Sequence, residues 1–212
     1  MKKNLKVKYI AILSTTTLTF IIGIIIGQLI AEYKMGEFSS FATKLRTSLL
    51  TINTQEKIAS EYLCDVNIFK LTEEKSNLGR TLTYLEDKFG KDNERIIELK
   101  KEYSLISIRQ FLLVKKFSKE CNKNLTIILF FYSNINNKTE SEMQGFILDS
   151  LYLKYPKNVV IYALDYDLDC KAIDTLENVY NITQVPSLVI NDKTYLGFVP
   201  KNEIENIILQ NL

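Results

Sequence analysis

Histidine is absent from this chain of 212 residues, and cysteine and proline are scarce, with three residues of each. Without histidine, the chain cannot contain a Ser-His-Asp triad, an imidazole acid–base catalyst or a histidine-ligated metal centre. The three cysteines, Cys64, Cys121 and Cys170, are too few and too widely spaced for a zinc knot. We therefore expect no metal site, no cofactor and no catalytic residue of these kinds.

A strong charge of either sign is also missing. The chain has 27 Lys and Arg residues against 25 Asp and Glu residues, which gives a formal net charge of +2. The basic residues are interleaved with acidic ones, as on an ordinary solvated surface, whereas nucleic-acid-binding domains gather basic residues into patches. No nucleic-acid partner is expected.

Charge is entirely absent from residues 9–31, which are dominated by Ile, Leu, Thr and Gly. About 20 apolar residues span the hydrocarbon core of a bilayer, so this run is predicted to lie in membrane lipid as a single-pass helix. Four lysines, Lys2, Lys3, Lys6 and Lys8, precede it. By the positive-inside rule, the N-terminus is cytoplasmic and the rest of the chain lies outside the cell membrane. A cleaved signal peptide is the alternative, although its apolar core is usually only about 7–15 residues.

Proline is absent from residues 37–120, where apolar residues recur at alternating steps of three and four, the period of a helix. We predict an α-helical hairpin with coiled-coil packing, in which Gly90 ends the first helix and Asp92 caps the second. Residues 38–50 are expected to continue from the membrane as a shorter helix. The apolar stripe consists of Ile58, Cys64, Ile68, Leu71, Leu78, Leu82, Leu85, Phe89, Ile96, Leu99, Tyr103, Ile106, Leu113 and Phe117.

Two of the cysteines fall at similar levels of this hairpin. Cys64 lies 26 residues before Gly90 and Cys121 lies 31 residues after it. With a rise of about 1.5 Å per residue, their levels differ by about 8 Å, close to the range of about 4.4–6.8 Å between α-carbons that a disulfide requires. The sequence does not fix the phase of the two helices, so a disulfide and two separate thiols both remain open.

The periodicity changes after Cys121. Continuous apolar runs at residues 125–132 and 159–164 predict buried strands. Shorter strands are predicted at residues 187–190 and 194–198, and helices at residues 140–155, 171–180 and 201–210. The order β-α-β-α-β-β-α implies a parallel pair with a right-handed crossover, followed by an antiparallel hairpin.

The segment Tyr-Asn-Ile-Thr-Gln-Val-Pro-Ser-Leu at residues 180–188 resembles the tyrosine-to-proline segment of thioredoxin-like domains. Phe-Phe-Tyr-Ser at residues 130–133 resembles the strand that delivers the redox motif of that family, and Asp165, Asp167 and Gly197 match further family positions. The resemblance implies an α/β thioredoxin-like domain over residues 122–212, with a cis peptide bond before Pro186. A membrane-anchored group of such proteins is similar overall, with an anchor corresponding to residues 1–32 and a helical hairpin corresponding to residues 33–121.

The redox dithiol of the family is missing from this chain. Residues 133–140 read Ser-Asn-Ile-Asn-Asn-Lys-Thr-Glu where the family has two cysteines two residues apart. Dithiol catalysis at this position is therefore excluded. In redox members the backbone beside the proline pairs with an extended peptide, so the resemblance implies a peptide or protein groove formed by Pro186, Val185, Gln184, Ser133, Asn134 and Asn136. The alternative, that Pro186 is only a turn that defines the fold, remains open.

These features lead to two hypotheses of function. In the first, the chain is a membrane-anchored, redox-inactive thioredoxin-like protein that serves as an extracytoplasmic binding or assembly module. In the second, it is a thiol-disulfide oxidoreductase that uses Cys64 and Cys121 as an exchangeable pair. Enzymatic activity is not expected in the first case, and Cys170 is expected to be a packing residue in both.

Overall fold

The computed structural model describes residues 2–211, except for the side chains of residues 2–7, 34 and 37. Lys2, Lys3 and Lys6, on which the predicted orientation of the anchor partly rests, are outside the described side chains. The chain forms two compact units, Met1–Leu45 and Arg46–Leu212. The second unit contains both the helical hairpin and the sheet, and the domain boundaries after residues 32 and 121 stay predictions.

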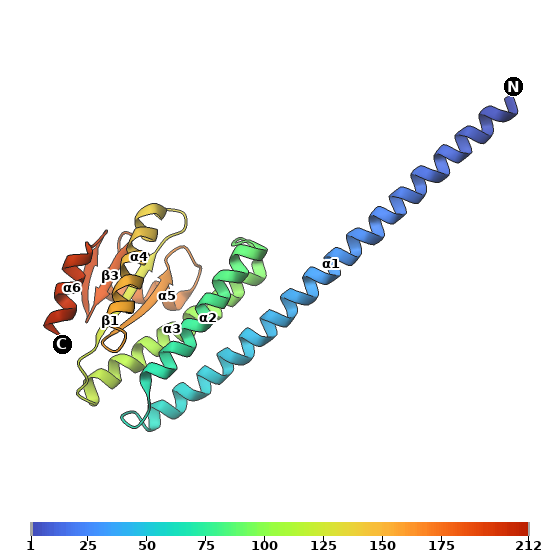
Figure 1. The fold of residues 1–212 in the computed structure, drawn as a ribbon. Coiled ribbons are helices and arrows are strands. Elements are labelled where there is room, and N and C mark those ends of the chain that lie inside the picture. Colours follow the sequence, from blue (N-terminus) through green and yellow to red (C-terminus); the bar gives the residue numbers. More distant parts are fainter. Residues whose placement is uncertain (1, 212) are drawn as a thin grey trace. The chain divides into compact units, whose positions relative to one another are not determined.

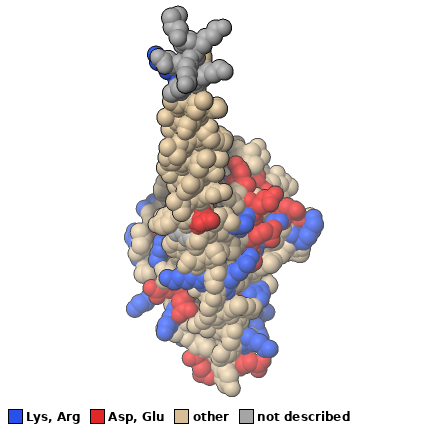
Figure 2. Space-filling view, turned by 90° about the vertical axis from the view of Figure 1, so that its right-hand side faces the viewer, with Lys and Arg blue, Asp and Glu red and all other residues tan. Residues whose placement is uncertain are grey.

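The first helix, α1 (Lys2–Glu61), is 60 residues long (Figure 1). Among the described residues, it is the one helix long and apolar enough to cross a bilayer, judged by length and composition alone, and a signal sequence passes the same test. Its apolar stretch carries no charged side chain (Figure 2). The hydroxyls of Thr15, Thr16, Thr17 and Thr19 donate to backbone carbonyls three or four residues earlier. These bonds satisfy polar groups that lipid would leave without partners.

Helix α1 extends further than predicted, because it continues beyond residue 50 to Glu61 without a break. Its last turns bury Leu49, Ile52 and Ala59, spaced three and seven residues apart so that they share one face of the helix. The chain then turns through residues 62–67. Helix α2 (Ile68–Phe89) starts after Asn67, whose side chain accepts a hydrogen bond of 3.3 Å from the amide of Lys70.

The predicted hairpin consists of α2 and α3 (Glu94–Glu120), joined by a turn at Gly90. Gly90 has a φ of 93°, a conformation that disfavours any residue with a side chain. The N-cap of α3 is Asn93 rather than the predicted Asp92, since the Asn93 side chain accepts a bond of 3.0 Å from the amide of Arg95. A cap must lie directly before the first helical residue, and the turn after Gly90 is one residue longer than expected.

The C-terminal part contains one four-stranded sheet in the order β2-β1-β3-β4. Its strands are β1 (Thr126–Tyr132), β2 (Val159–Asp165), β3 (Ser187–Ile190) and β4 (Lys193–Leu196), and its helices are α4 (Lys138–Lys154), α5 (Lys171–Tyr180) and α6 (Lys201–Gln210). Strand β1 is parallel to β2 and antiparallel to β3, which is antiparallel to β4. The predicted order β-α-β-α-β-β-α is confirmed.

Helices cover both faces of this sheet (Figure 1). Helices α4 and α6 pack on one face, where Leu148 and Ile204 join Ile128 and Phe130 of β1 in one apolar cluster. On the other face, α5 is accompanied by α3 of the hairpin. Phe111, Val114 and Phe117 of α3 share a second cluster with Leu129 and Phe131 of β1, and with Ile173 and Leu176 of α5. The hairpin therefore contributes a layer of the α/β core.

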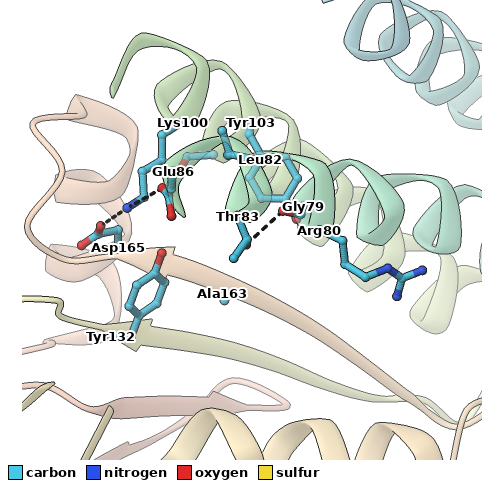
Figure 3. A pocket seen from close by; sticks show the side chains of 11 residues that line it. Gly79, Arg80, Leu82, Thr83, Glu86, Lys100, Tyr103, Tyr132, Ala163 and Asp165 are labelled. Carbon is cyan, nitrogen blue, oxygen red and sulfur yellow. Dashed lines mark hydrogen bonds and ion pairs between the residues drawn. The ribbon is translucent and has the colours of Figure 1, made fainter. Parts of the chain in front are cut away.

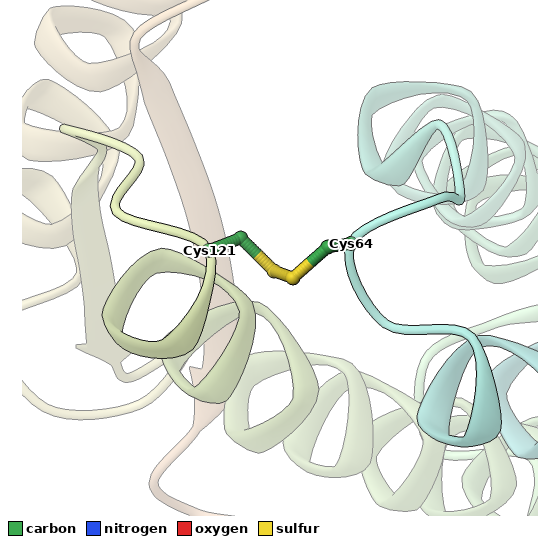
Figure 4. The surroundings of a disulfide bond; sticks show 2 residues. All are labelled: Cys64 and Cys121. Atoms are coloured by element: carbon green, nitrogen blue, oxygen red, sulfur yellow. A yellow bond between two sulfur atoms is a disulfide. The ribbon is translucent and has the colours of Figure 1, made fainter.

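Cys64 and Cys121 form a disulfide in the structure, with their α-carbons 5.5 Å apart (Figure 4). Cys64 lies in the turn between α1 and α2, not within a helix, and Cys121 is the C-cap of α3. The bond closes a loop of 57 residues that contains the whole hairpin. It joins the turn after α1 to the end of the helix that packs on the sheet.

Replacement of both bonded cysteines, as Cys64→Ser with Cys121→Ser, should lower the free energy of unfolding of the full chain by about 2–4 kcal/mol, because the unfolded chain loses the constraint of a long loop. Urea titration of the purified chain in detergent measures this change. Cys170→Ser, at a buried cysteine outside the bond, is the control for the loss of a thiol. Equal stability of the double variant and the parent would show that the bond does not restrain the fold.

Candidate functional site

The C-terminal end of β1 and the start of β3 meet at one end of the sheet. The loop of residues 133–137 follows β1, and a cis peptide bond between Val185 and Pro186 precedes β3. These two segments are brought together because Phe131 of β1 pairs with Ser187 of β3. The Asn137 side chain closes the gap, since its Nδ2 donates to the carbonyl oxygen of Val185 at 3.0 Å.

The loop is held by the carboxylate of Asp167, which lies just beyond β2. Asp167 Oδ2 accepts from the Ser133 hydroxyl at 2.7 Å and from the Asn134 amide at 3.0 Å. It also accepts from the amide of Ile135, at 3.3 Å. The Ser133 oxygen in turn accepts from the amides of Ile135 and Asn136, at 3.0 and 2.7 Å. Hydrogen bonds to a charged acceptor are stronger than those between neutral groups. The Asp167 carboxylate therefore holds the loop in one conformation.

A second carboxylate, Asp165, connects the loop with the hairpin. Its Oδ2 accepts from Asn134 Nδ2 at 3.0 Å and from the ammonium of Lys100, on α3, at 2.5 Å. Lys100 also pairs with Glu86 of α2 at 3.2 Å (Figure 3). Asp165 is 5% exposed, so water screens this pair weakly. The network therefore ties three elements together: the hairpin, the end of β2 and the loop.

Burial has opposite effects on the two titratable groups beside Asp165. It lowers the pKa of the Lys100 ammonium, but the bond to Asp165 and the negative charges of Asp165 and Glu86 outweigh it, and the net pKa of Lys100 is raised. Burial raises the pKa of the Tyr132 phenol. At neutral pH, Lys100 is therefore charged and Tyr132 is neutral, so neither group is poised for proton transfer near pH 7.

The surface beside the cis peptide is formed by only part of the predicted groove. Pro186, Val185 and Ser133 are buried, whereas Gln184 and Asn136 are exposed. Ile135, which the prediction omitted, has 75% of its surface exposed. A single isoleucine between two polar loop residues belongs to no helical or strand period, so the sequence alone did not predict it as a surface residue of the site.

Several residues that shape the site were also missed as site residues. Asp165 and Asp167 were noted only as matches to family positions, and Lys100 was assigned to the hairpin. Ser141 of α4 contributes a further bond, since its Oγ accepts from the Ser133 amide at 3.2 Å. The apolar periods that predict helices and strands carry no information on such bonds between distant segments.

The cysteines lie away from this loop. Cys170 is buried at the N-cap of α5. The Cys64–Cys121 bond precedes β1, whereas the loop follows it, and a strand of seven residues is about 23 Å long at about 3.3 Å per residue. The disulfide is thus separated from the cis peptide by the length of the strand. Among the described residues, no cluster of His, Cys, Asp or Glu could hold a metal ion.

Comparison with known proteins gives a limited result. No family model matches this chain, and no curated protein matches it either. Among solved structures, thioredoxin-2 of the malaria parasite, described as a component of its protein secretion machinery, is 20% identical, with 41% of this chain and 82% of that chain covered and a TM-score of 0.35. Chloroplastic thioredoxin z is 19% identical, with 46% and 88% covered and a TM-score of 0.36. Another malarial protein has 19% identity, 42% and 98% coverage and a TM-score of 0.35.

Asp167→Ala should release the loop, because two backbone amides and one hydroxyl lose a charged acceptor. We expect the free energy of unfolding to fall by about 1–2 kcal/mol. The loss is small for a charged acceptor because water partly solvates the Asp167 carboxylate. Hydrogen exchange at the amides of Asn134 and Ile135 should become faster. Asp169→Ala, two residues further and exposed, is the matched control. Equal exchange rates in the two variants would refute the role of Asp167.

Proposed function

We propose that this chain is a membrane-anchored thioredoxin-like protein without dithiol activity, and that its outer part binds a partner protein beside Pro186. The anchor is α1, whose uncharged run of residues 9–31 follows several lysines, which favours a cytoplasmic N-terminus by the positive-inside rule. The thioredoxin-like part covers residues 122–212. Its partner would be another membrane or extracytoplasmic protein.

One observation carries this proposal: the loop at the position expected for the dithiol has its backbone amides and the Ser133 hydroxyl bonded within the chain. Ser133 and Asn134 are both anchored to Asp167. A thiol-exchange site instead needs an accessible sulfur whose pKa is lowered. The network at Asp167 also gives the loop a defined conformation in the absence of any reaction, as a preformed binding surface requires.

The backbone acceptor beside the cis peptide is already used. Asn137 donates to the Val185 carbonyl, and Ser187 donates to the Gln184 carbonyl at 2.7 Å. A peptide N–H that donates to these carbonyl oxygens would have to share them with Asn137 and Ser187 or displace these donors. We therefore assign partner binding to the exposed side chains of Ile135 and Gln184 rather than to strand pairing at Val185.

Photocrosslinking in native membranes tests this surface. A benzoylphenylalanine at residue 135 should give one discrete adduct with a partner protein, because a side chain that is 75% exposed reaches any molecule docked beside Pro186. The same probe at Leu209, an apolar α6 residue with 52% exposure, is the matched control. When Gln184→Ala is combined with the probe at residue 135, the yield of the adduct should fall severalfold. Adducts of equal yield and size at both positions would show that residue 135 marks no specific interface.

The competing function, thiol-disulfide exchange through the exposed Cys64, is tested by the reduction potential of its bond. A bond that only holds the fold together should have a potential below about −300 mV, as structural bonds of secreted proteins do, whereas an exchangeable bond is more oxidising. Equilibration of the full chain with dithiothreitol buffers, followed by thiol alkylation, measures the potential. A value near about −200 mV, together with turnover of a model disulfide, would favour the oxidoreductase.

A further inference from the structure

Strand β2 forms one edge of the sheet, because its neighbour on one side is β1 and no described strand lies on its other side. At the two ends of the β1–β2 ladder, Thr126 donates to Asn158 and Tyr166 donates to Tyr132. Bonds to a parallel neighbour use every second residue of a strand, so the peptide groups of Ile161 and Ala163 point away from β1. No described residue provides a hydrogen-bond partner for them.

This edge lacks the features that usually protect edge strands from further pairing. The sequence of β2, Val-Val-Ile-Tyr-Ala-Leu-Asp, contains no lysine, proline or glycine, whereas exposed edges are commonly blocked by lysine, proline or a bulge. Its only charged residue, Asp165, is engaged by Lys100 and Asn134. Ala163 is small and exposed, which leaves room beside the strand.

A groove follows this edge along the strand. A pocket of about 380 Å³ lies between α2 and the end of β2 (Figure 3), and a second pocket of about 430 Å³ continues it toward α4. Arg80, Tyr103 and Ala163 line both pockets. One wall is formed by α2 and the other by Tyr152 and Leu153 of α4. The two pockets together are large enough for several residues of an extended peptide, and they border the unpaired groups of β2.

The second pocket contains a buried cation without a counter-ion. Lys75 is 4% exposed, and its ammonium lies 4.5 Å from the ring centroid of Tyr162 and 5.5 Å from that of Tyr103. Within the part of the chain that the structure describes, it makes no hydrogen bond or ion pair. Tyr162 also lines this pocket, and its buried hydroxyl has no hydrogen-bond partner among the described residues. A buried charge is costly unless an opposite charge pairs with it, so the pocket is suited to an anion.

We propose that the edge of β2 binds an extended, acidic peptide segment of a partner protein by strand addition. The peptide backbone pairs with the outward groups of Ile161 and Ala163, and a Glu or Asp side chain of the peptide reaches Lys75. Charge favours this occupant, since Lys75 and Arg80 face a single carboxylate, Asp149, among the residues that line the second pocket. This site is separate from the surface at Ile135.

Ala163→Pro tests the strand addition. Proline removes the outward N–H of residue 163 and leaves the ladder with β1 intact, as proline does in edge strands. Ala163→Val is the matched control, because it adds bulk and keeps the N–H. A displayed library of random 12-residue peptides is selected against the full chain in lipid nanodiscs, and binders are remade synthetically. We expect the recovered peptides to contain Asp or Glu and to bind Ala163→Pro at least about tenfold more weakly, equivalent to about 1.4 kcal/mol.

Lys75→Met tests the carboxylate contact independently of the backbone. The parent chain should bind a peptide with Gln in place of its Glu about tenfold or more weakly than the original peptide. Lys75→Met should bind the Glu peptide and the Gln peptide with equal affinity. Lys75→Arg should restore the difference. On peptide addition, the amides of Ile161 and Ala163 should become protected from hydrogen exchange, whereas Ile135→Asn should leave binding unchanged.

Four results would overturn the proposal. The first is a library that yields no peptide whose binding Ala163→Pro weakens, and the second is a set of acidic binders whose affinity Lys75→Met leaves unchanged. Protection of Ile161 and Ala163 that rises with protein concentration in the absence of peptide would assign the edge to a second copy of this chain. Loss of binding in Ile135→Asn would place the peptide at the Pro186 surface instead.

Discussion

The packing of α3 on the sheet is the constraint on which the other features depend. Its residues Phe111, Val114 and Phe117 lie in the same cluster as the central strand, so the hairpin cannot move without opening the α/β core. Each fully buried aliphatic or aromatic side chain contributes about 1.5–3 kcal/mol. This fixed position brings Lys100 to Asp165 and places α2 beside the edge of β2. The loop network and the groove are both consequences of it.

The loop after β1 is held by hydrogen bonds within the chain itself. The carboxylate of Asp167 accepts bonds from three donors on consecutive loop residues. The same network satisfies backbone amides that would otherwise need water or a ligand. Asn137 then occupies the carbonyl beside Pro186. These bonds hold the loop in one conformation without a ligand.

Much of the fold followed from the sequence, because the apolar periods of 3.6 and 2 residues directly reflect burial. The seven elements after Cys121 and the cis bond at Pro186 are present as predicted. The errors concern contacts between distant segments. The end of α1 at Glu61 depends on packing against the hairpin, and the roles of Asp167 and Lys75 depend on neighbours more than 20 residues away. Side-chain spacing along one element contains no record of such neighbours.

The sheet presents two surfaces of different chemistry, and their positions follow from its topology. The Pro186 surface lies where β1 ends, and the carbonyl oxygens of Gln184 and Val185 already accept bonds within the chain. Among the described residues, no partner is found for the outward backbone groups of β2 or for the buried ammonium of Lys75. A surface with satisfied backbone can recognise a partner only through side chains, whereas a free edge recognises any extended segment and relies on a charge for selectivity. Under the two proposals above, a partner protein at the Pro186 surface and an extended peptide at the edge of β2 would occupy different parts of the sheet.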